Sequence, residues 1–430
     1  MKTILGSRKH HYIMKLSVFL ITAALIAGMA GCGPTTRYDL TMAVAGGNGT
    51  ATDLTNASPY AAGTGVSIKA VANSGYRFVN WTAPAGTFGT ASAAETTFTM
   101  PSQNITVTAN FAPFAGGTGT EEDPYQITDW YQLDNVRNYP DSCFILLNNL
   151  DSTSAGYAEL ASPTASGGNG WRPIGNLNNI FAGTFDGQGY EIRNLFINRP
   201  DEWLVGLFGR VGQGVNLTTG VIENLALANC TVTGDVPVGG LVGASYGTVT
   251  NCYATGTVTG NFSVGGLMGR TGQGGYVSIS HFTGNVTGNG EVGGLAGCNE
   301  GGTVVNCHAA GYATGNVTVG GSHVGGLLGD NYGTVTNCHA TGSVAGGNGV
   351  GGLVGYSYGG SVTNSFWDTE TSGQSTSDGG TGKNTTEMQD IITFSDAGWN
   401  VTAVALNETN PAYIWNIVNN VTYPFLSWQA

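Results

Sequence analysis

Two pentapeptides, residues 243–247 and 355–359, match the G-x-S-x-G pattern that surrounds the nucleophilic serine of many hydrolases. Such a serine needs a sharp turn from strand to helix, with an acid and a histidine within reach. Both matches instead fall at one position of an internal repeat, where other copies carry Thr271, Asn299 and Asn331. The pattern is therefore typical of a repeat position, and we predict no catalytic residue.

Two Cys-His pairs, Cys307-His308 and Cys338-His339, supply residue types that bind zinc. Adjacent residues of a strand point to opposite faces, so the sulfurs and the imidazoles would not converge on one ion. We therefore predict no metal site and no cofactor. The two histidines share a repeat position with other planar side chains, which predicts one stacked column: Tyr253, Phe282, His308, His339 and Phe366.

A column of tyrosines offers binding chemistry. Tyr246, Tyr332 and Tyr358 occupy equivalent positions of the repeat, each is followed by a glycine, and Tyr356 lies two residues before Tyr358. This placement predicts an exposed turn, where the flat face and hydroxyl of tyrosine suit a sugar ring or a protein partner. The scarcity of nearby charge favours a neutral glycan. A tyrosine stack that only stiffens the fold is the alternative.

The composition excludes some classes of function. The chain of 430 residues contains 71 glycines, only 10% charged residues and a formal net charge of −13. Between residues 211 and 382 the single lysine or arginine is Arg270. A basic nucleic-acid surface is therefore excluded, and the glycine content disfavours long helices. A polysaccharide lyase or hydrolase would need clustered carboxylates, often with lysine or arginine. It remains an alternative, as does a passive envelope spacer.

An internal repeat decides the fold. The pattern G-G-L-x-G recurs in five copies whose first glycines are 26, 28, 32 and 26 residues apart. Each period holds three short runs of strand-forming residues and no helical pattern, whereas a propeller blade usually needs about 40 residues. We predict an all-β fold, a right-handed parallel β-helix preceded by a small β-grasp-like module. The five copies are residues 239–243, 265–269, 293–297, 325–329 and 351–355.

A second repeat position carries asparagines, which tolerate left-handed backbone in turns and can bond each other when stacked. We interpret them as a structural ladder, with Ser280 at the missing place: Asn224, Asn251, Asn306, Asn337 and Asn364. The cysteines that follow three of them, Cys252, Cys307 and Cys338, share a position with Leu225 and Ser365. That favours small, buried, reduced cysteines, although disulfides are the alternative in an exported protein.

The first residues predict an export signal. Lys15 precedes an apolar run of residues 16–28, which Met29, Ala30, Gly31 and Cys32 follow. A charged start, a short apolar stretch and small residues before a cleavage point are typical of a secretory signal. The last four residues resemble a bacterial lipobox, which implies lipidation of Cys32 and a membrane anchor.

Two parts of the chain resemble known protein families. Residues 75–81, 98–101 and 107–111 resemble the internalin-type B-repeat of bacterial surface proteins, which implies a spacer without chemistry. The G-G-L-x-G copies resemble the GLUG motif of bacterial surface proteins, and similarity extends over residues 123–428. Such repeats occur in adhesin-like proteins and beside the catalytic unit of some immunoglobulin A peptidases. The GLUG family has no catalytic residues of its own to carry over.

These observations predict a non-enzymatic, adhesin-like surface lipoprotein, monomeric, that binds a glycan or a surface protein. We expect two caps on the β-helix, with a helix over residues 130–137 at one end and a helix begun by Thr386 and Gln389 at the other. The predicted organisation is a signal peptide (1–31), a tether (32–37), a B-repeat-like module (38–113), a linker (114–123), an N-terminal cap (124–170), a β-helix (171–365) and a closing segment (366–430).

Overall fold

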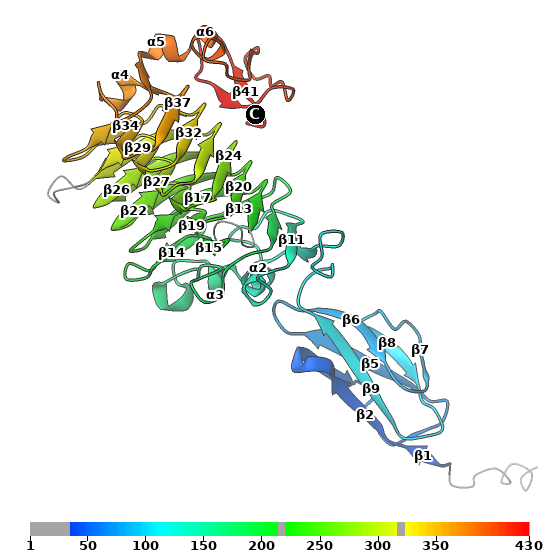
Figure 1. Cartoon of the computed structure of the whole chain (residues 1–430). Helices are drawn as coiled ribbons and strands as arrows, with labels where there is room; N and C mark the ends of the chain where they lie inside the picture. The colour runs from blue at the N-terminus through cyan, green and yellow to red at the C-terminus, as the bar shows by residue number, and fades with distance from the viewer. Residues whose placement is uncertain (1–34, 214–219, 316–322, 430) are drawn as a thin grey trace, which may run out of the picture. The chain divides into compact units, whose positions relative to one another are not determined.

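The computed structural model describes residues 35–213, 220–315 and 323–429, which form two compact units (Figure 1). The first unit holds the residues up to Asn73 together with Phe78–Phe111. The second holds Ser74–Arg77 and the chain from Ala112 onward. The predicted signal peptide and the lipidation site Cys32 lie outside the described residues.

The first unit is a small β domain. Val66, Ile68 and Ala70 alternate with exposed residues in one strand and are buried, as the sequence pattern predicts. Strands β2 and β9 pair in parallel, whereas β3, β5, β8 and β7 pair antiparallel. Its elements are β1 (Arg37–Tyr38), β2 (Leu40–Val44), η1 (Ala45–Gly47), β3 (Gly49–Asp53), β4 (Tyr60–Ala61), β5 (Gly65–Ala72), β6 (Arg77–Thr82), β7 (Thr87–Phe88), β8 (Glu95–Thr99) and β9 (Ile105–Ala112).

The second unit is a parallel β-helix, as the repeat predicts. Each coil contributes one strand to each of several sheets, and equivalent strands of successive coils pair in parallel (Figure 1). The nine-stranded sheet contains β10 (Tyr125–Ile127), β11 (Cys143–Leu146), β12 (Thr184–Asp186), β16 (Val221–Glu223), β20 (Thr248–Thr250), β24 (Tyr276–Ser278), β28 (Thr303–Val305), β32 (Thr334–Thr336) and β37 (Ser361–Thr363).

Three further sheets complete the coils. The ten-stranded sheet contains β13 (Glu191–Arg193), β14 (Phe196–Asn198), β17 (Ala226–Thr233), β21 (Tyr253–Thr259), β25 (His281–Gly288), β29 (His308–Gly315), β33 (His339–Ala340), β34 (Ser343–Ala345), β38 (Phe366–Asp368) and β39 (Thr381–Lys383). The six-stranded sheet contains β15 (Phe208–Val211), β19 (Val242–Ser245), β23 (Met268–Thr271), β27 (Ala296–Asn299), β31 (Leu328–Asn331) and β36 (Val354–Ser357). The five-stranded sheet contains β18 (Val238–Gly239), β22 (Phe262–Gly265), β26 (Gly290–Gly293), β30 (Val324–Gly325) and β35 (Val350–Gly351).

The G-G-L-x-G repeat forms the sharp corner between the five- and six-stranded sheets. Its leucines are fully buried in one continuous core. The glycines are required because other parts of the fold approach their backbones closely. A Cβ on Gly266 would lie 2.1 Å from the ring of Phe282, and a Cβ on Gly297 would lie 2.3 Å from backbone atoms of Ser263 and Val264. The glycines of the motif therefore lie where a coil packs closely against the opposite wall of the β-helix and against the preceding coil.

The N-terminal end is closed by a helix and a buried tryptophan pair. Helix α2 (Trp130–Asn135) begins at Asp129, whose carboxylate accepts the N–H of Gln132, and it buries Trp130 and Leu133. The ring of Trp130 lies 5.7 Å from that of Trp171. Strands β10 and β11 on either side of α2 already belong to the nine-stranded sheet, so residues 124–170 contribute strands as well as a cap. The other short helices here are η2 (Val136–Asn138), α3 (Tyr157–Leu160) and η3 (Ala165–Gly168).

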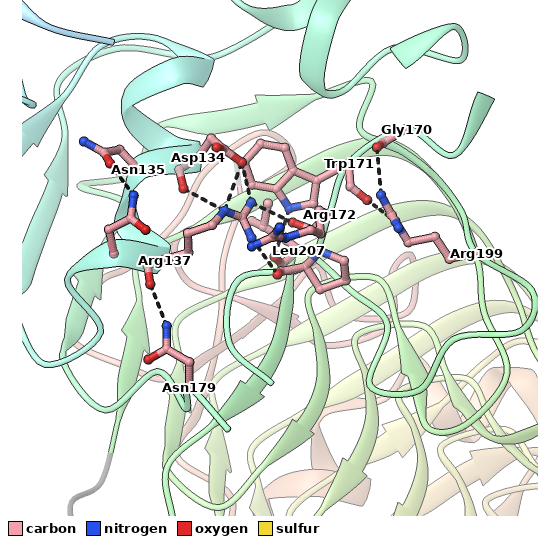
Figure 2. A network of polar contacts seen from close by, with 11 residues as sticks. Asp134, Asn135, Arg137, Gly170, Trp171, Arg172, Asn179, Arg199 and Leu207 are labelled. Atoms are coloured by element: carbon pink, nitrogen blue, oxygen red, sulfur yellow. Dashed lines mark hydrogen bonds and ion pairs between the residues drawn. The ribbon is translucent and has the colours of Figure 1, made fainter. Parts of the chain in front are cut away.

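A polar network fixes this cap to the first coil (Figure 2). The guanidinium of Arg137 donates to the carbonyls of Pro173 and Arg172, at 3.0 and 2.9 Å, and pairs with the carboxylate of Asp134. The same guanidinium lies 5.5 Å from the ring of Trp171. Since these backbone acceptors belong to residues 36 and 35 positions away, Arg137 joins two segments that are distant in the sequence.

The C-terminal part closes the last coil and then doubles back. Ser377 Oγ accepts hydrogen bonds from the backbone N–H groups of Leu353 and Val354, and the Asp378 carboxylate accepts one from the N–H of Ser357. These backbone donors at the end of the solenoid therefore have hydrogen-bond partners. The residues that follow form helix α5 (Thr385–Met388), helix α6 (Ile391–Ser395) and strands β40 (Val401–Ala403), β41 (Trp415–Ile417) and β42 (Phe425–Leu426), after the earlier helix α4 (Thr369–Ser372).

Residues 384–429, which we call the flank segment, lie along the outer face of the ten-stranded sheet. Trp415 lies 5.8 Å from His308 and 5.3 Å from His339, and Gln429 bonds His281. The predicted helix start at Thr386 and Gln389 was wrong. The capping box is formed by Asn384 and Glu387, because these side chains reach each other's backbone N–H groups.

Candidate functional site

Three of the predicted tyrosines gather at one outer corner of the late coils, and we call Tyr332, Tyr356 and Tyr358 the tyrosine strip. Their exposed fractions are 42%, 38% and 68%. The rings of Tyr332 and Tyr358, on successive coils, have centroids 6.3 Å apart. The planes of these two rings are 59° apart, so they offer two adjacent apolar faces with hydroxyl groups at their edges.

A buried carboxyl and a partly exposed imidazole beneath the tyrosine strip hold it in place. Asp330 is 2% exposed and accepts a 2.6 Å hydrogen bond from Nδ1 of His323 and a 3.3 Å bond from the hydroxyl of Tyr332. The His323 ring stacks on Tyr356 with centroids 4.6 Å apart. Burial raises the pKa of Asp330, and burial beside this carboxyl raises the pKa of Tyr332 to about 12. Tyr332 therefore presents an uncharged phenol at neutral pH.

The fourth predicted tyrosine, Tyr246, lies in the same column but in a different setting. Its ring lies over the backbone of Gly272 in the next coil, where a Cβ would come within 2.2 Å. The guanidinium of Arg210 lies 4.8 Å from the ring centroid on the other side. Tyr246 is thus a packing residue rather than part of the tyrosine strip.

The asparagine column forms left-handed turn positions. Asn224, Asn251, Asn306, Asn337 and Asn364 all have φ between 46° and 53°. Asn251 donates to Asn224 at 2.7 Å, and Asn224 donates to Asp186 at 2.9 Å. The assignment of Ser280 to this column was wrong. Ile279 pairs opposite the asparagine position with φ 48°, and its alkyl side chain interrupts the amide bonds.

Ser280 instead occupies the cysteine column. Its hydroxyl donates to the carbonyl of Ser278 at 2.7 Å, as the thiols of Cys252 and Cys338 donate to the carbonyls two residues before them. Burial raises the pKa of the Cys252 thiol to about 12, so it is not a nucleophile at neutral pH. The thiols of the described cysteines are free rather than disulfide-bonded: Cys143, Cys230, Cys252, Cys298, Cys307 and Cys338.

Neither G-x-S-x-G serine is placed for catalysis. Ser245 is fully buried, and its hydroxyl hydrogen-bonds the backbone of Gly247. Ser357 bonds the carbonyl and side-chain amide of Asn331. Both serines lie in one inward column with Thr271 and Asn299, as the repeat phase predicts.

The planar column is a histidine stack. The assignment of Phe282 to it was wrong, because His281 pairs with Tyr253 and His308 while Phe282 points into the core. The rings of His281 and His308 lie 4.7 Å apart, and those of His308 and His339 lie 4.9 Å apart. The stack is outward-facing but buried, because the flank segment covers it.

Burial keeps these imidazoles neutral. Burial, with His308 beside it, lowers the pKa of His281 to about 2, and burial lowers that of His308 to about 4. Burial also lowers the pKa of His339 well below its ordinary value. Sequence reasoning did not find the covering of this stack. Its only signal was the cluster of tryptophans near the C-terminus, which indicated a core but not its location.

Comparison with known families identifies two parts of the chain. Residues 38–115 match the model described as "Divergent InlB B-repeat domain". Residues 238–259 and 320–345 match the model described as "The GLUG motif". The chain carries the GLUG motif. Both resemblances found from the sequence are thereby confirmed.

Two curated relatives are similar to part of this chain. A "Putative Gly-rich membrane protein" of Evansella cellulosilytica is 40% identical over 148 residues, which cover 33% of this chain and 16% of the relative. "Halomucin" of Haloquadratum walsbyi is 37% identical over 144 residues, which cover 33% of this chain and 2% of the relative. The similarity therefore spans only a small part of each relative.

A solved structure confirms the architecture of the GLUG region. It is described as a "putative immunoglobulin A1 protease" from Bacteroides ovatus, and it superposes with a TM-score of 0.53 and 22% identity over 74% of this chain and 96% of that one. At this identity the likeness shows the fold alone. In the three described ranges of the chain, no helix is long and apolar enough to cross a lipid bilayer.

Proposed function

We propose that this GLUG-motif protein is a non-enzymatic, lipid-anchored surface protein whose tyrosine strip binds a neutral glycan. The observation that carries the proposal is the strip itself: three partly exposed phenol rings on two successive coils, with a buried carboxyl and an imidazole behind them. Partly exposed aromatic rings suit the apolar face of a sugar, and their hydroxyls suit its polar edge. The curated relatives, a Gly-rich membrane protein and a halomucin by name, support a place at the cell surface.

Replacing Tyr358 by alanine, alone and with Tyr332→Ala, is expected to lower glycan binding at least tenfold, because stacking area is lost. Folding should change by less than about 1 kcal/mol for Tyr358→Ala, since a 68% exposed ring packs little. The measurement is a glycan array with the full chain, together with a reducing-sugar release assay and thermal unfolding.

The matched control is Tyr312→Ala. Tyr312 is similarly exposed, at 62%, but lies in the ten-stranded sheet. The proposal fails if Tyr312→Ala and Tyr358→Ala lower binding equally, or if no glycan binds. Release of sugar by the unaltered protein would instead show a carbohydrate-active enzyme.

The anchor is a second part of the proposal. Replacing Cys32 by alanine is expected to move the protein from the membrane fraction to the soluble exported fraction, because the acylated thiol would be missing. Membrane fractionation and metabolic labelling with a fatty acid measure this. Cys143→Ala is the control, since Cys143 follows no export signal. An unchanged distribution of Cys32→Ala would exclude the anchor.

A further inference from the structure

The tyrosine strip is the end of a longer row of residues that runs along the axis of the β-helix. In four consecutive coils, the first residue after the strand of the six-stranded sheet donates its backbone N–H to a carbonyl of the preceding coil. These bonds, of 2.7–3.0 Å, run from Gly272 to Ser245, from Glu300 to Thr271, from Tyr332 to Asn299 and from Tyr358 to Asn331. The four donors therefore occupy one position of the coil, and successive members lie about 4.8 Å apart.

Three members of this row present exposed side chains. Tyr332 and Tyr358 belong to the tyrosine strip, and the side chain of Glu300 in the preceding coil is 55% exposed. The Glu300 carboxylate pairs with the guanidinium of Arg270 at 3.2 Å. Gly272 adds no side chain to the row. The row thus offers, in order along the axis, an ion pair and two phenol rings.

The two phenol rings cannot both stack on one sugar. Their planes are 59° apart, and their centroids are 6.3 Å apart. The flat apolar face of a tyrosine packs on a flat face of its partner, so two rings that share one sugar must be nearly parallel. The rings of Tyr332 and Tyr358 therefore suit two successive sugar residues, each packed against its own ring.

The ring of Tyr332 is held in place before any ligand binds. Its hydroxyl donates to the buried carboxyl of Asp330 at 3.3 Å, and Nδ1 of His323 donates to the same carboxyl at 2.6 Å. A phenol that donates its hydrogen keeps its oxygen as an acceptor, here for a sugar hydroxyl. Because the ring is already fixed, binding costs little side-chain entropy.

The ion pair beside the rings supplies polar contacts for a third sugar residue. The Glu300 carboxylate accepts hydrogen bonds from hydroxyl groups, and the Arg270 guanidinium donates them. Nη2 of Arg270 also donates to the hydroxyl of Ser263 at 3.4 Å, which orients the guanidinium. Since Glu300 lies one coil before Tyr332, the pair meets the next residue of a chain that follows the axis.

The charge around the row disfavours an acidic glycan. Burial, together with the carboxyls of Asp330 and Glu291, raises the pKa of Tyr332, so both carboxyls lie near its hydroxyl. Glu300 adds a third carboxyl, whereas Arg270 is the only lysine or arginine in the sequence of these coils. An acidic glycan would therefore meet more acidic than basic groups, and a neutral glycan would meet hydrogen-bond acceptors.

We propose that this row binds a linear, neutral oligosaccharide of at least three sugar residues that runs along the axis of the β-helix. Two successive residues pack on the rings of Tyr358 and Tyr332, and the next one bonds the pair of Glu300 and Arg270. This inference rests on the proposed function, and it adds the length and the path of the glycan.

The test measures how affinity depends on chain length, by calorimetry on the full chain. The probes are cello-, laminari-, manno- and chito-oligosaccharides of one to five residues, with trigalacturonate as the acidic probe. In at least one neutral series, we expect the dissociation constant to fall about thirtyfold or more from the monosaccharide to the trisaccharide. It should then stay within about twofold up to the pentasaccharide, because the row has no further exposed member.

Two variants assign the ends of the row. Glu300→Ala should weaken binding of the trisaccharide about tenfold and leave the disaccharide unchanged, because two rings still hold two residues. Tyr358→Ala should weaken binding of both. The control is Glu159→Ala, which removes an exposed carboxylate from α3 and should change neither affinity. Thermal unfolding checks that each variant is folded, as expected for exposed positions.

The outcomes separate this inference from the proposed function. If no oligosaccharide binds at about 10 mM, both fail. If the monosaccharide binds as tightly as the trisaccharide, or if Glu300→Ala binds the trisaccharide as Glu159→Ala does, the inference fails while glycan binding at the tyrosine strip stands. Tighter binding of trigalacturonate than of every neutral trisaccharide would also overturn it.

Discussion

Deleting residues 385–430 is expected to make the protein aggregate, because it uncovers the whole outward column that the flank segment buries. The column would then expose the apolar ring of Phe366 beside three imidazole rings that are buried in the full chain. Apolar surface that is uncovered in this way promotes association. Light scattering coupled to size-exclusion chromatography should show oligomers in place of a monomer, and a dye that binds apolar surface should gain fluorescence.

A single substitution in the flank segment tests how much this segment contributes to stability. Trp415 is fully buried against His308, His339 and Trp399, so Trp415→Ala should cost about 3–5 kcal/mol of unfolding free energy. Trp203→Ala, at an exposed position, should cost less than about 0.5 kcal/mol. A soluble deletion variant that is as stable as the full chain would show that the flank segment does not hold the fold.

Acidification from pH 7 to pH 4 is expected to destabilise the protein strongly, through the histidine stack. The native pKa values of His281, His308 and His339 lie below the ordinary value of about 6.5. Below pH 6.5 the unfolded chain therefore binds protons that the native chain does not, and stability falls as the pH falls. Each such proton contributes about 1.4 kcal/mol per pH unit, so three histidines contribute up to about 4 kcal/mol per unit.

Denaturant titrations at pH 7, 6, 5 and 4 measure this dependence. The matched variant is His308→Phe, which keeps a planar ring in the stack, as Phe366 does in the last coil. It should lower the slope by about one proton. Unfolding free energies that stay constant from pH 7 to pH 4.5, or an identical slope in the variant, would contradict a neutral buried stack.

The parallel β-helix could be predicted because its coils repeat. The spacing of the G-G-L-x-G copies, and the burial that each leucine needs, admit few other folds. The register of one coil could not be assigned by chemical similarity. Ser280 resembles asparagine in polarity. However, Gly256 pairs with Gly284, and counting five residues back from each glycine aligns Asn251 with Ile279, so Ile279 occupies the asparagine column. Backbone position in the coil, rather than side-chain type, fixes the register.

The location of the flank segment could not be predicted. It depends on contacts between residues more than a hundred positions apart, such as Gln429 with His308 and His281. The sequence pattern shows that Trp415 and Trp428 are apolar enough to be buried, but any outer face of the solenoid could accept them. The planar column determines which outer face the tryptophans cover. The sequence pattern assigned only some of the residues of that column correctly.

The flank segment also orders events in time. The chain emerges from its N-terminus during synthesis, and each coil can pair with the one before it using contacts about 26–32 residues apart. Gln429 meets His281 across 148 residues, so this docking must wait until those coils exist. Once docked, the segment contacts several coils at the same time. The segment thus docks after the coils that it covers, and its release alone would uncover the histidine stack without separating one coil from the next.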